Sequence, residues 1–197
     1  MSHYFQEDTK LDYKPFLIKY EIAKKEFSLY SSAGLFSKNH LDYGTKYLLE
    51  ALLKESITGK VLDLGCGIGV IGITLSTLFS NLTLTYADIN NKCLEITRKN
   101  LEYSQKSGKV ILSDGFLNIK EMYDAIVMNP PIRVGKEKLK EIFTQAQAHL
   151  NSLGSLYLVI RKDHGGLSWL TFLEKIYQEV KILDKRKGYL IFDCKNS

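Results

Sequence analysis

Short apolar runs alternate with segments of helical periodicity from residue 61 onward, and this alternation constrains the fold most. Strands are predicted at residues 61–64, 82–87, 110–112, 123–128, 156–160, 180–183 and 189–193. Helices are predicted at residues 43–54, 70–78, 91–104, 137–150 and 167–177. Strands that alternate with helices form parallel sheets covered on both faces. The sequence therefore predicts an α/β fold with a mostly parallel sheet that ends in a C-terminal antiparallel hairpin.

The first 30 residues differ from the rest of the chain. Residues 1–14 are polar and mixed, whereas residues 16–22 and 26–30 are two short strand-like runs separated by a three-residue turn. A chain of 197 residues suits one domain with a full core and a short extension. We expect residues 1–30 to form an arm and a short β-hairpin, and residues 31–197 to form a single domain.

Composition narrows the cellular setting. No apolar run reaches the length of about 18 residues that a membrane span needs, and the first 25 residues lack the apolar core of a signal peptide. The three cysteines, Cys66, Cys93 and Cys194, are odd in number and have no metal-ligand spacing. The net charge of +5 is on the side expected of a nucleic-acid binder. We expect a cytoplasmic protein without a metal or a membrane partner, and the oligomeric state stays open.

A glycine-rich loop follows the strand at residues 61–64 and opens the next helix. Its sequence is Asp63-Leu64-Gly65-Cys66-Gly67-Ile68-Gly69, and with Gly72 it also matches the G-x-G-x-x-G pattern of dinucleotide-binding proteins. Asp88 ends the next strand, where a carboxylate can bind ribose hydroxyls of a dinucleotide or of an adenosyl cofactor. Asp63 would repel a pyrophosphate but attract an α-amino group. The loop therefore favours S-adenosylmethionine over NAD.

Four further residues in or near this loop are candidates for cofactor contact. Asp114 precedes Gly115 at the end of a strand, so it is either an acceptor for an adenine amino group or a turn aspartate. We place Gly115 beside it, and Ile89 beside Asp88, in the same predicted site. Cys66 lies between two glycines and has no neighbouring base, so we interpret it as a small residue in close contact with the ligand.

The sequence Asn129-Pro130-Pro131-Ile132 follows a buried strand and forms the candidate catalytic corner. Two prolines end a strand abruptly, and the residue before a proline is held in an extended conformation. The corner therefore presents two hydrogen-bond acceptors, the amide oxygen of Asn129 and the carbonyl of Pro130. An exocyclic amino group, which has two N–H donors in one plane, would fit them. A simple strand-ending turn is the alternative.

These motifs, taken in order, resemble those of class I methyltransferases of the methyltransferase small domain type. Within that family the chain is most similar to ribosomal-RNA guanine-N2 methyltransferases and their single-domain bacterial relatives. The resemblance is carried by Gly34-Leu35-Phe36-Ser37, Asp42-x-Gly44-Thr45, the glycine loop, Asp88, Asp114, Asn129-Pro130-Pro131-Ile132-Arg133-x-Gly135-Lys136 and Lys187-Gly188-Tyr189.

The resemblance implies a seven-stranded Rossmann-like fold and S-adenosylmethionine as the cofactor. It also implies that Phe36, Gly44 and Thr45 border the methionine end of that cofactor. One departure is that many relatives have Tyr or Phe after the prolines, to stack on the target base, where this chain has Ile132.

Basic residues follow the predicted strands that flank the corner. Because ligands of open α/β sheets bind at the carboxyl ends of the strands, these residues are predicted to surround the corner and contact phosphates. They are Arg133, Lys136, Arg161, Lys162, His164, Lys185, Arg186 and Lys187. Lysines that simply occupy solvated loops are the alternative.

The sequence thus predicts an enzyme that transfers a methyl group from S-adenosylmethionine to a base amino group in RNA. Guanine N2 of small-subunit ribosomal RNA is the expected target, and ribosomal RNA or a ribosomal subunit the expected partner. One alternative is a protein glutamine N-methyltransferase, because an amide also presents two N–H donors. The other is a non-catalytic module that binds S-adenosylmethionine and RNA.

Overall fold

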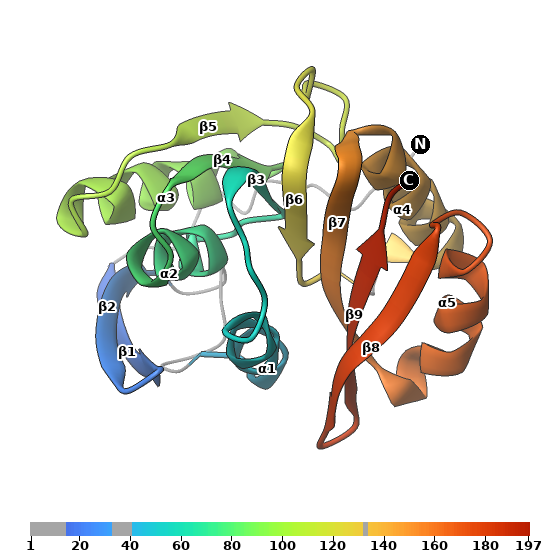
Figure 1. Ribbon diagram of the computed structural model, residues 1–197. Helices are drawn as coiled ribbons and strands as arrows, with labels where there is room; N and C mark the ends of the chain where they lie inside the picture. The colour runs from blue at the N-terminus through green and yellow to red at the C-terminus, as the bar shows by residue number, and fades with distance from the viewer. Residues whose placement is uncertain (1–14, 33–40, 132–133) are drawn as a thin grey trace.

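A computed structural model describes residues 15–32, 41–131 and 134–197 (Figure 1). Its main sheet has seven strands in the order β5-β4-β3-β6-β7-β9-β8. Neighbouring strands are parallel except where β9 lies antiparallel between β7 and β8. This confirms the predicted α/β sheet with its C-terminal hairpin. The strands are β3 (Gly59–Leu64), β4 (Leu82–Asp88), β5 (Lys109–Leu112), β6 (Tyr123–Met128), β7 (Leu150–Arg161), β8 (Glu179–Arg186) and β9 (Tyr189–Lys195).

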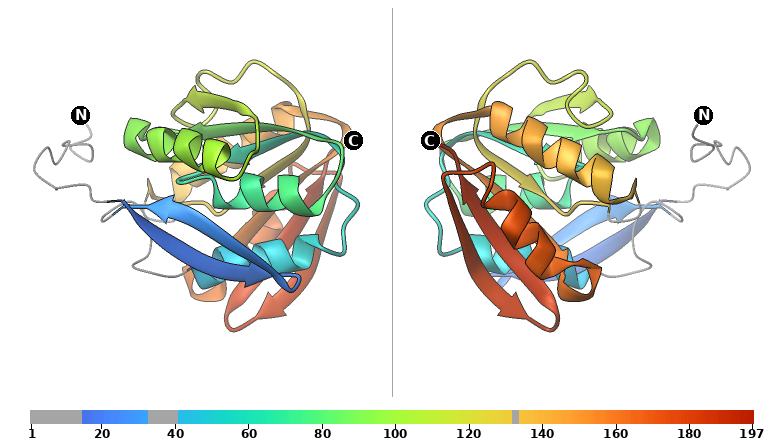
Figure 2. Two further views of the ribbon diagram at one scale, coloured as in Figure 1. Left: turned by 90° about the vertical axis from the view of Figure 1, so that its left-hand side faces the viewer. Right: turned by 90° about the vertical axis from the view of Figure 1, so that its right-hand side faces the viewer.

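Helices cover both faces of this sheet. One apolar core joins the sheet to α1 (Tyr43–Leu52), α2 (Val70–Leu78) and α3 (Asn91–Tyr103). The other core joins it to α4 (Lys136–Ala148) and α5 (Gly166–Leu173), which the right-hand view of Figure 2 shows against the opposite face. Side chains alternate between the two cores, because successive residues of a strand point to opposite faces. Val61 of β3 therefore packs in the first core and Leu62 in the second.

Strands β1 (Phe16–Ile22) and β2 (Lys25–Ser31) form a separate antiparallel hairpin. Ala23 and Lys24 turn it with φ values of 55° and 61°, the twist that suits a two-residue hairpin loop. The hairpin packs on the helices of the first core (Figure 2, left). The side chain of Asn100 in α3 bonds both the N–H and the carbonyl of Tyr30 in β2, at 2.7 and 2.9 Å.

Three predicted boundaries were wrong by three residues or more. Strand β8 was predicted to end at Leu183 but continues to Arg186, because its last three residues pair with β9. Strand β7 begins at Leu150, six residues earlier than predicted, because Leu150 pairs with Tyr123 before the register between β6 and β7 shifts. Helix α5 ends at Leu173 although the apolar spacing continues to Tyr177. The chain leaves the helix in tight turns, but Tyr177 stays buried and donates a hydrogen bond to the carbonyl of Phe143. An apolar spacing cannot distinguish a helical turn from a buried loop residue.

The carboxyl ends of β3, β4, β5, β6, β7 and β8 all meet at one edge of the sheet, which we call the carboxyl rim. Strands β7 and β8 reach it together because Tyr189, the first residue of β9, pairs with both Arg161 and Arg186. The end of β8 and the turn at Lys187 and Gly188 therefore lie beside the end of β7, as predicted, but Lys185 and Arg186 belong to β8 and not to that turn. Among the described residues, no helix is long and apolar enough to cross a membrane.

Candidate active site

The glycine loop joins β3 to α2 at the carboxyl rim. Gly65, Gly67 and Gly69 have φ values of 71°, 55° and 85°, a region that L side chains rarely adopt. A Cβ atom built on Gly65 or Gly67 would have no atom within 4 Å. The loop is tied to β4 because the N–H groups of Gly65 and Cys66 both donate to the carbonyl of Ala87. The two glycines thus leave space in which a ligand can approach the backbone.

Asp88 lies at the end of β4, next to that loop. Its carboxylate accepts hydrogen bonds from the N–H groups of Gly67, at 2.8 Å, and Asn90, at 2.9 Å. Partial burial raises the pKa of Asp88 above its ordinary value, and the hydrogen bonds from the backbone oppose that rise. The predicted ribose acceptor is therefore held against the loop in one orientation.

Asp63 is fully buried beneath the loop. Its Oδ2 atom accepts a hydrogen bond from the N–H of Gly72 at 2.8 Å, whereas its Oδ1 atom is buried without a hydrogen-bond partner among the described residues. Burial raises the pKa of Asp63 to about 7, and the negative charge of Asp88 adds to that rise. A buried acceptor without a donor is costly, and a donating ligand group that reached Oδ1 would remove that cost.

Asn129 follows β6 and is held by helix α1. Its Nδ2 atom lies 3.0 Å from Oδ2 of Asp42 and 3.0 Å from Oγ1 of Thr45. A carboxylate only accepts, so these contacts fix the amide with its NH2 group toward α1 and leave its oxygen for another donor. Asp42 also caps α1, by accepting from the N–H groups of Gly44 and Thr45. Sequence reasoning gave Asp42 no role, although an Asp just before a helical pattern is an N-cap signal.

The rest of the corner is partly described. Pro130 is buried and Pro131 is exposed. No donor among the described residues contacts the carbonyl of Pro130 or the Oδ1 atom of Asn129. Both predicted acceptors therefore lack a hydrogen-bond partner in the described part of the chain. Ile132, Arg133 and Phe36 were also predicted to belong to the site, and they lie outside the described residues.

The remaining predicted cofactor residues lie around the glycine loop and β5. Cys66 is buried, and desolvation together with the nearby Asp63 raises the pKa of its thiol, so it is not a ready nucleophile. Ile89 is exposed beside Asp88. Asp114 is exposed, with its Oδ1 atom 3.8 Å from the Nζ atom of Lys138, a lysine whose position next to this carboxylate was not predicted. Gly115 follows with a φ of 54°.

The predicted basic residues differ in whether they are paired with an acidic side chain. Arg161 makes two hydrogen bonds to Asp163, and Arg186 is paired with Glu50 and Asp184. The Nζ atom of Lys136 lies 3.9 Å from a Cβ built on Gly165, which directly follows His164, so the ends of β6 and β7 do come together. The predicted basic residues without an ion pair among the described residues are Lys136, Lys162, His164, Lys185 and Lys187.

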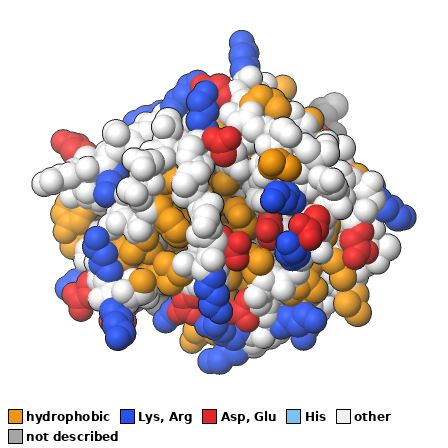
Figure 3. Space-filling view, viewed as in Figure 1, with side chains coloured by type: hydrophobic (Ala, Val, Ile, Leu, Met, Phe, Trp, Pro, Cys, Tyr) orange, Lys and Arg blue, Asp and Glu red, His pale blue; other side chains and the backbone are white. Residues whose placement is uncertain are grey.

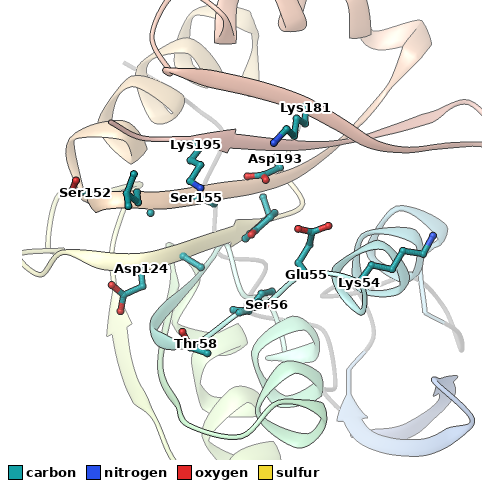
Figure 4. Close-up of a pocket in the computed structure, with 15 residues that line it drawn as sticks. Lys54, Glu55, Ser56, Thr58, Asp124, Ser152, Ser155, Lys181, Asp193 and Lys195 are labelled. Carbon is teal, nitrogen blue, oxygen red and sulfur yellow. The ribbon is translucent and has the colours of Figure 1, made fainter.

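A polar cavity of about 430 Å³ lies elsewhere, near the amino ends of the parallel strands (Figure 4). Its walls carry both signs of charge, including Glu55, Asp193 and Lys181. Acidic and basic side chains are likewise interspersed over the face seen in Figure 3. Neither Asn129 nor any residue of the glycine loop lines this cavity. Within the described part of the chain, no group of three or more His, Cys, Asp or Glu side chains could hold a metal ion.

With this geometry in place, comparison with known proteins identifies the family. The model of the methyltransferase small domain family matches residues 26–193. The chain belongs to this family. It is therefore a methyltransferase, and the family uses S-adenosylmethionine as the methyl donor.

Relatives of this methyltransferase are found both at its own length and at about twice that length. It is 33% identical to protein YbxB of Bacillus subtilis (strain 168), over 98% of both chains. It is 36% identical to ribosomal RNA small subunit methyltransferase C of Haemophilus influenzae (strain PittEE), over 87% of this chain and 52% of the relative. The methyltransferase therefore spans about half the length of that relative.

The fold of this methyltransferase is also found among solved structures. The 16S rRNA N2 G1207 methyltransferase of T. thermophilus, solved with AdoMet and guanosine, matches with a TM-score of 0.81 and 24% identity. The match covers 93% of this chain and 51% of that one. It confirms the predicted class I methyltransferase fold.

Proposed function

We propose that this methyltransferase methylates an exocyclic amino group of a base in RNA, with guanine N2 of small-subunit ribosomal RNA as the target. The observation that carries the proposal is the orientation of Asn129. Its NH2 group is held by Asp42 and Thr45, so its oxygen is left as an acceptor, and the carbonyl of the next residue, Pro130, offers a second one. Two fixed acceptors match the two N–H donors of an amino group. The names of the longer relatives, which are ribosomal RNA methyltransferases, support the choice of substrate.

The residues around the glycine loop fit S-adenosylmethionine. Asp88 is placed to accept from ribose hydroxyls, and the open space over Gly65 and Gly67 admits a ligand to the backbone. The unpartnered Oδ1 atom of Asp63 suits an α-amino group. Cys66, Ile89, Gly115 and Asp114 would border the adenosyl part, whereas Gly44 and Thr45 lie against Asn129, where the reacting groups would meet.

When bound, S-adenosylmethionine supplies an electrophilic methyl group on a positively charged sulfur. The lone pair of a base amino group is conjugated with the ring and is a poor nucleophile. If Asn129 Oδ1 and the Pro130 carbonyl each accept one N–H, they direct that lone pair out of the base plane and stabilise the positive charge that develops on nitrogen. Transfer would form the N–C bond as the C–S bond breaks, and the acidic product nitrogen would release its proton to water.

The basic residues of the carboxyl rim support RNA as the substrate. Five of them, at positions 136, 162, 164, 185 and 187, are exposed and have no ion pair among the described residues. Such groups can release counterions from phosphates, which gives salt-dependent affinity. A ribosomal substrate also implies that the protein acts in the cytoplasm.

Two alternatives remain as outcomes of the same test. Purified protein would be incubated with small ribosomal subunits and isotopically labelled S-adenosylmethionine, with the Asn129→Ala variant as the control. Labelled N2-methylguanosine in the RNA, identified by nucleoside mass spectrometry and lost in the variant, supports the proposal. Label in a glutamine of a ribosomal protein would indicate a protein methyltransferase. Cofactor binding without any transfer would indicate a non-catalytic module.

A further inference from the structure

Three tyrosine rings form a continuous row at the carboxyl rim. The rings of Tyr43 and Tyr47 in α1 are stacked, with centroids 6.0 Å apart and planes 24° apart. The ring of Tyr47 meets that of Tyr189 edge to face, with centroids 5.7 Å apart. The row therefore leads from the exposed start of α1 to the start of β9.

Each ring of this row has a basic side chain over it. The Nζ atom of Lys187 lies 5.8 Å from the centroid of the Tyr43 ring. The guanidinium of Arg186 lies 5.2 Å from the centroid of Tyr47, and the guanidinium of Arg161 lies 5.7 Å from that of Tyr189. Rings interleaved with cations are the usual components of surfaces that bind single-stranded nucleic acid.

The row adjoins the candidate catalytic corner. A Cβ built on Gly44 would lie 3.2 Å from the ring of Tyr189 and 3.4 Å from Nδ2 of Asn129. Gly44 thus touches both the ring row and the amide proposed to bind the target amino group. Tyr43 directly precedes Gly44 in the chain, so it is the sequence neighbour of the residue that makes both contacts.

One ring and one cation of the row stand out as free. Tyr47 is buried, and Tyr189 is half-buried, whereas the side chain of Tyr43 is 57% exposed. Arg161 and Arg186 are paired with carboxylates, whereas Lys187 has no ion pair among the described residues. Tyr43 and Lys187 are therefore the pair that a ligand can reach without breaking a salt bridge.

We propose that Tyr43 stacks on an unpaired base next to the methylated nucleotide, with Lys187 contacting the phosphate of that base. The proposal rests on the proposed function, because it needs RNA at the Asn129 corner. An exposed tyrosine ring, backed by a second ring, offers a rigid apolar face at little cost in side-chain entropy. Among the described residues, the ammonium of Lys187 contacts the Tyr43 ring and no carboxylate, so it can move to a phosphate. Base stacking is tolerant of sequence, so Tyr43 would select unpaired RNA and not a particular base.

Binding of short fluorescein-labelled RNA, measured by anisotropy, tests the pair. The probes are a single strand and a blunt duplex of the same sequence, because the base faces of a duplex are already covered. The variants are Tyr43→Ala, Tyr43→Phe and Lys187→Ala. Tyr103→Ala is the matched control, since Tyr103 is also an exposed tyrosine near a helix end, but at the end of α3. Thermal melting and S-adenosylmethionine binding check that each variant is folded.

We expect Tyr43→Ala to weaken single-strand binding about tenfold, because a stacked base contributes on the order of 1–3 kcal/mol. Duplex binding should be unchanged, Tyr43→Phe should bind like the parent, and Lys187→Ala should lower the salt dependence by about one phosphate contact. If folded Tyr43→Ala binds the single strand like the parent, or loses both probes equally, the stacking role is wrong even if the parent methylates ribosomal RNA. If the parent binds neither probe and methylates no RNA, both this inference and the proposed function are overturned.

Discussion

The Nδ2 atom of Asn129 lies 3.0 Å from the Oδ2 atom of Asp42, although 87 positions separate the two residues. The contact joins the end of β6 to the cap of α1. One carboxylate therefore starts a helix and also sets which way the candidate catalytic amide faces. This dual role separates the effects expected of substitutions at the two positions.

Replacing Asn129 with alanine should leave S-adenosylmethionine affinity within a fewfold of the parent and reduce turnover on RNA by about 10²–10³. The reason is that its oxygen acts on the amino group mainly as positive charge develops there. Single-turnover kinetics, combined with calorimetry of the cofactor, would measure the two effects separately. A variant that methylates RNA at the parent rate would reduce the Asn129-Pro130-Pro131 corner to a simple turn.

Replacing Asp42 with serine should keep the helix cap but remove the carboxylate that orients Asn129. We expect kcat to fall about tenfold or more, since a charge-assisted hydrogen bond contributes roughly 1.5–3 kcal/mol, while KM and the melting temperature change little. Asp42→Ala is the comparison variant, because it loses the cap as well and should also lose about 0.5–2 kcal/mol of stability. Equal kcat values for parent and Asp42→Ser would show that Asp42 is only a cap.

Replacing Asp88 with alanine should weaken S-adenosylmethionine binding by roughly 1.5–3 kcal/mol, because hydrogen bonds from ribose hydroxyls to a carboxylate are lost. Calorimetry with S-adenosylmethionine and with adenine alone would separate the ribose contribution, since adenine should bind both proteins equally. Unchanged cofactor affinity, or tighter binding of NAD than of S-adenosylmethionine by the parent, would contradict the assignment.

Asp63 should make stability depend on pH. Its pKa of about 7 in the folded protein exceeds the ordinary value of 3.8, so the folded state keeps a proton that the unfolded state has already lost. Stability should therefore fall as pH rises from about 4 to about 7. Urea unfolding of the parent and of Asp63→Asn across this range measures the difference. Asp88, whose pKa is also raised, contributes with the same sign in both proteins. Parallel pH profiles would show that Asp63 is not the group responsible.

We expect the unpaired lysines of the carboxyl rim to contribute to RNA binding, and lysines that are paired with a carboxylate not to contribute. Replacing Lys136 and Lys162 with alanine should weaken RNA binding and lower its salt dependence by up to about two phosphate contacts. Replacing Lys109 and Lys140, which are paired with Glu121 and Glu137, provides the control with the same change in net charge. Anisotropy titrations at several salt concentrations give the slopes. Identical slopes for the two double variants would place the phosphate contacts elsewhere.

The order of strands and helices could be predicted because each element has its own local signal. The buried runs at 61–64 and 123–128 and the spacing of Leu94, Thr97 and Leu101 in α3 needed no knowledge of their neighbours. The extent of β7 could not be predicted, because its first residues are strand only through pairing with β6. Interactions across long sequence separations have no such local signal.

The features of the candidate site also fall into two groups, those that a short motif predicts and those that depend on contacts between distant segments. The glycine loop, Asp88 and the proline corner could be proposed from short motifs, since each motif changes the backbone locally. The hold of Asp42 on Asn129, and the pairing of Arg186 with Glu50, depend on how β6, α1 and β8 come together. The row of tyrosine rings is drawn from α1 and β9, and no single segment of the sequence contains its pattern.

The amide of Asn100 also has a consequence for how the molecule opens. The same Nδ2 group that bonds the Tyr30 carbonyl of the hairpin donates to the carbonyl of Ile68 in the glycine loop, at 2.9 Å in both cases. The hairpin and the loop therefore share one buried connection, and neither can detach without disturbing it. In native-state hydrogen exchange, the amide proton of Tyr30 would then belong to the same cooperative unit as the loop, and ligand binding at the loop would slow exchange in β2, a strand that contains none of the predicted site residues.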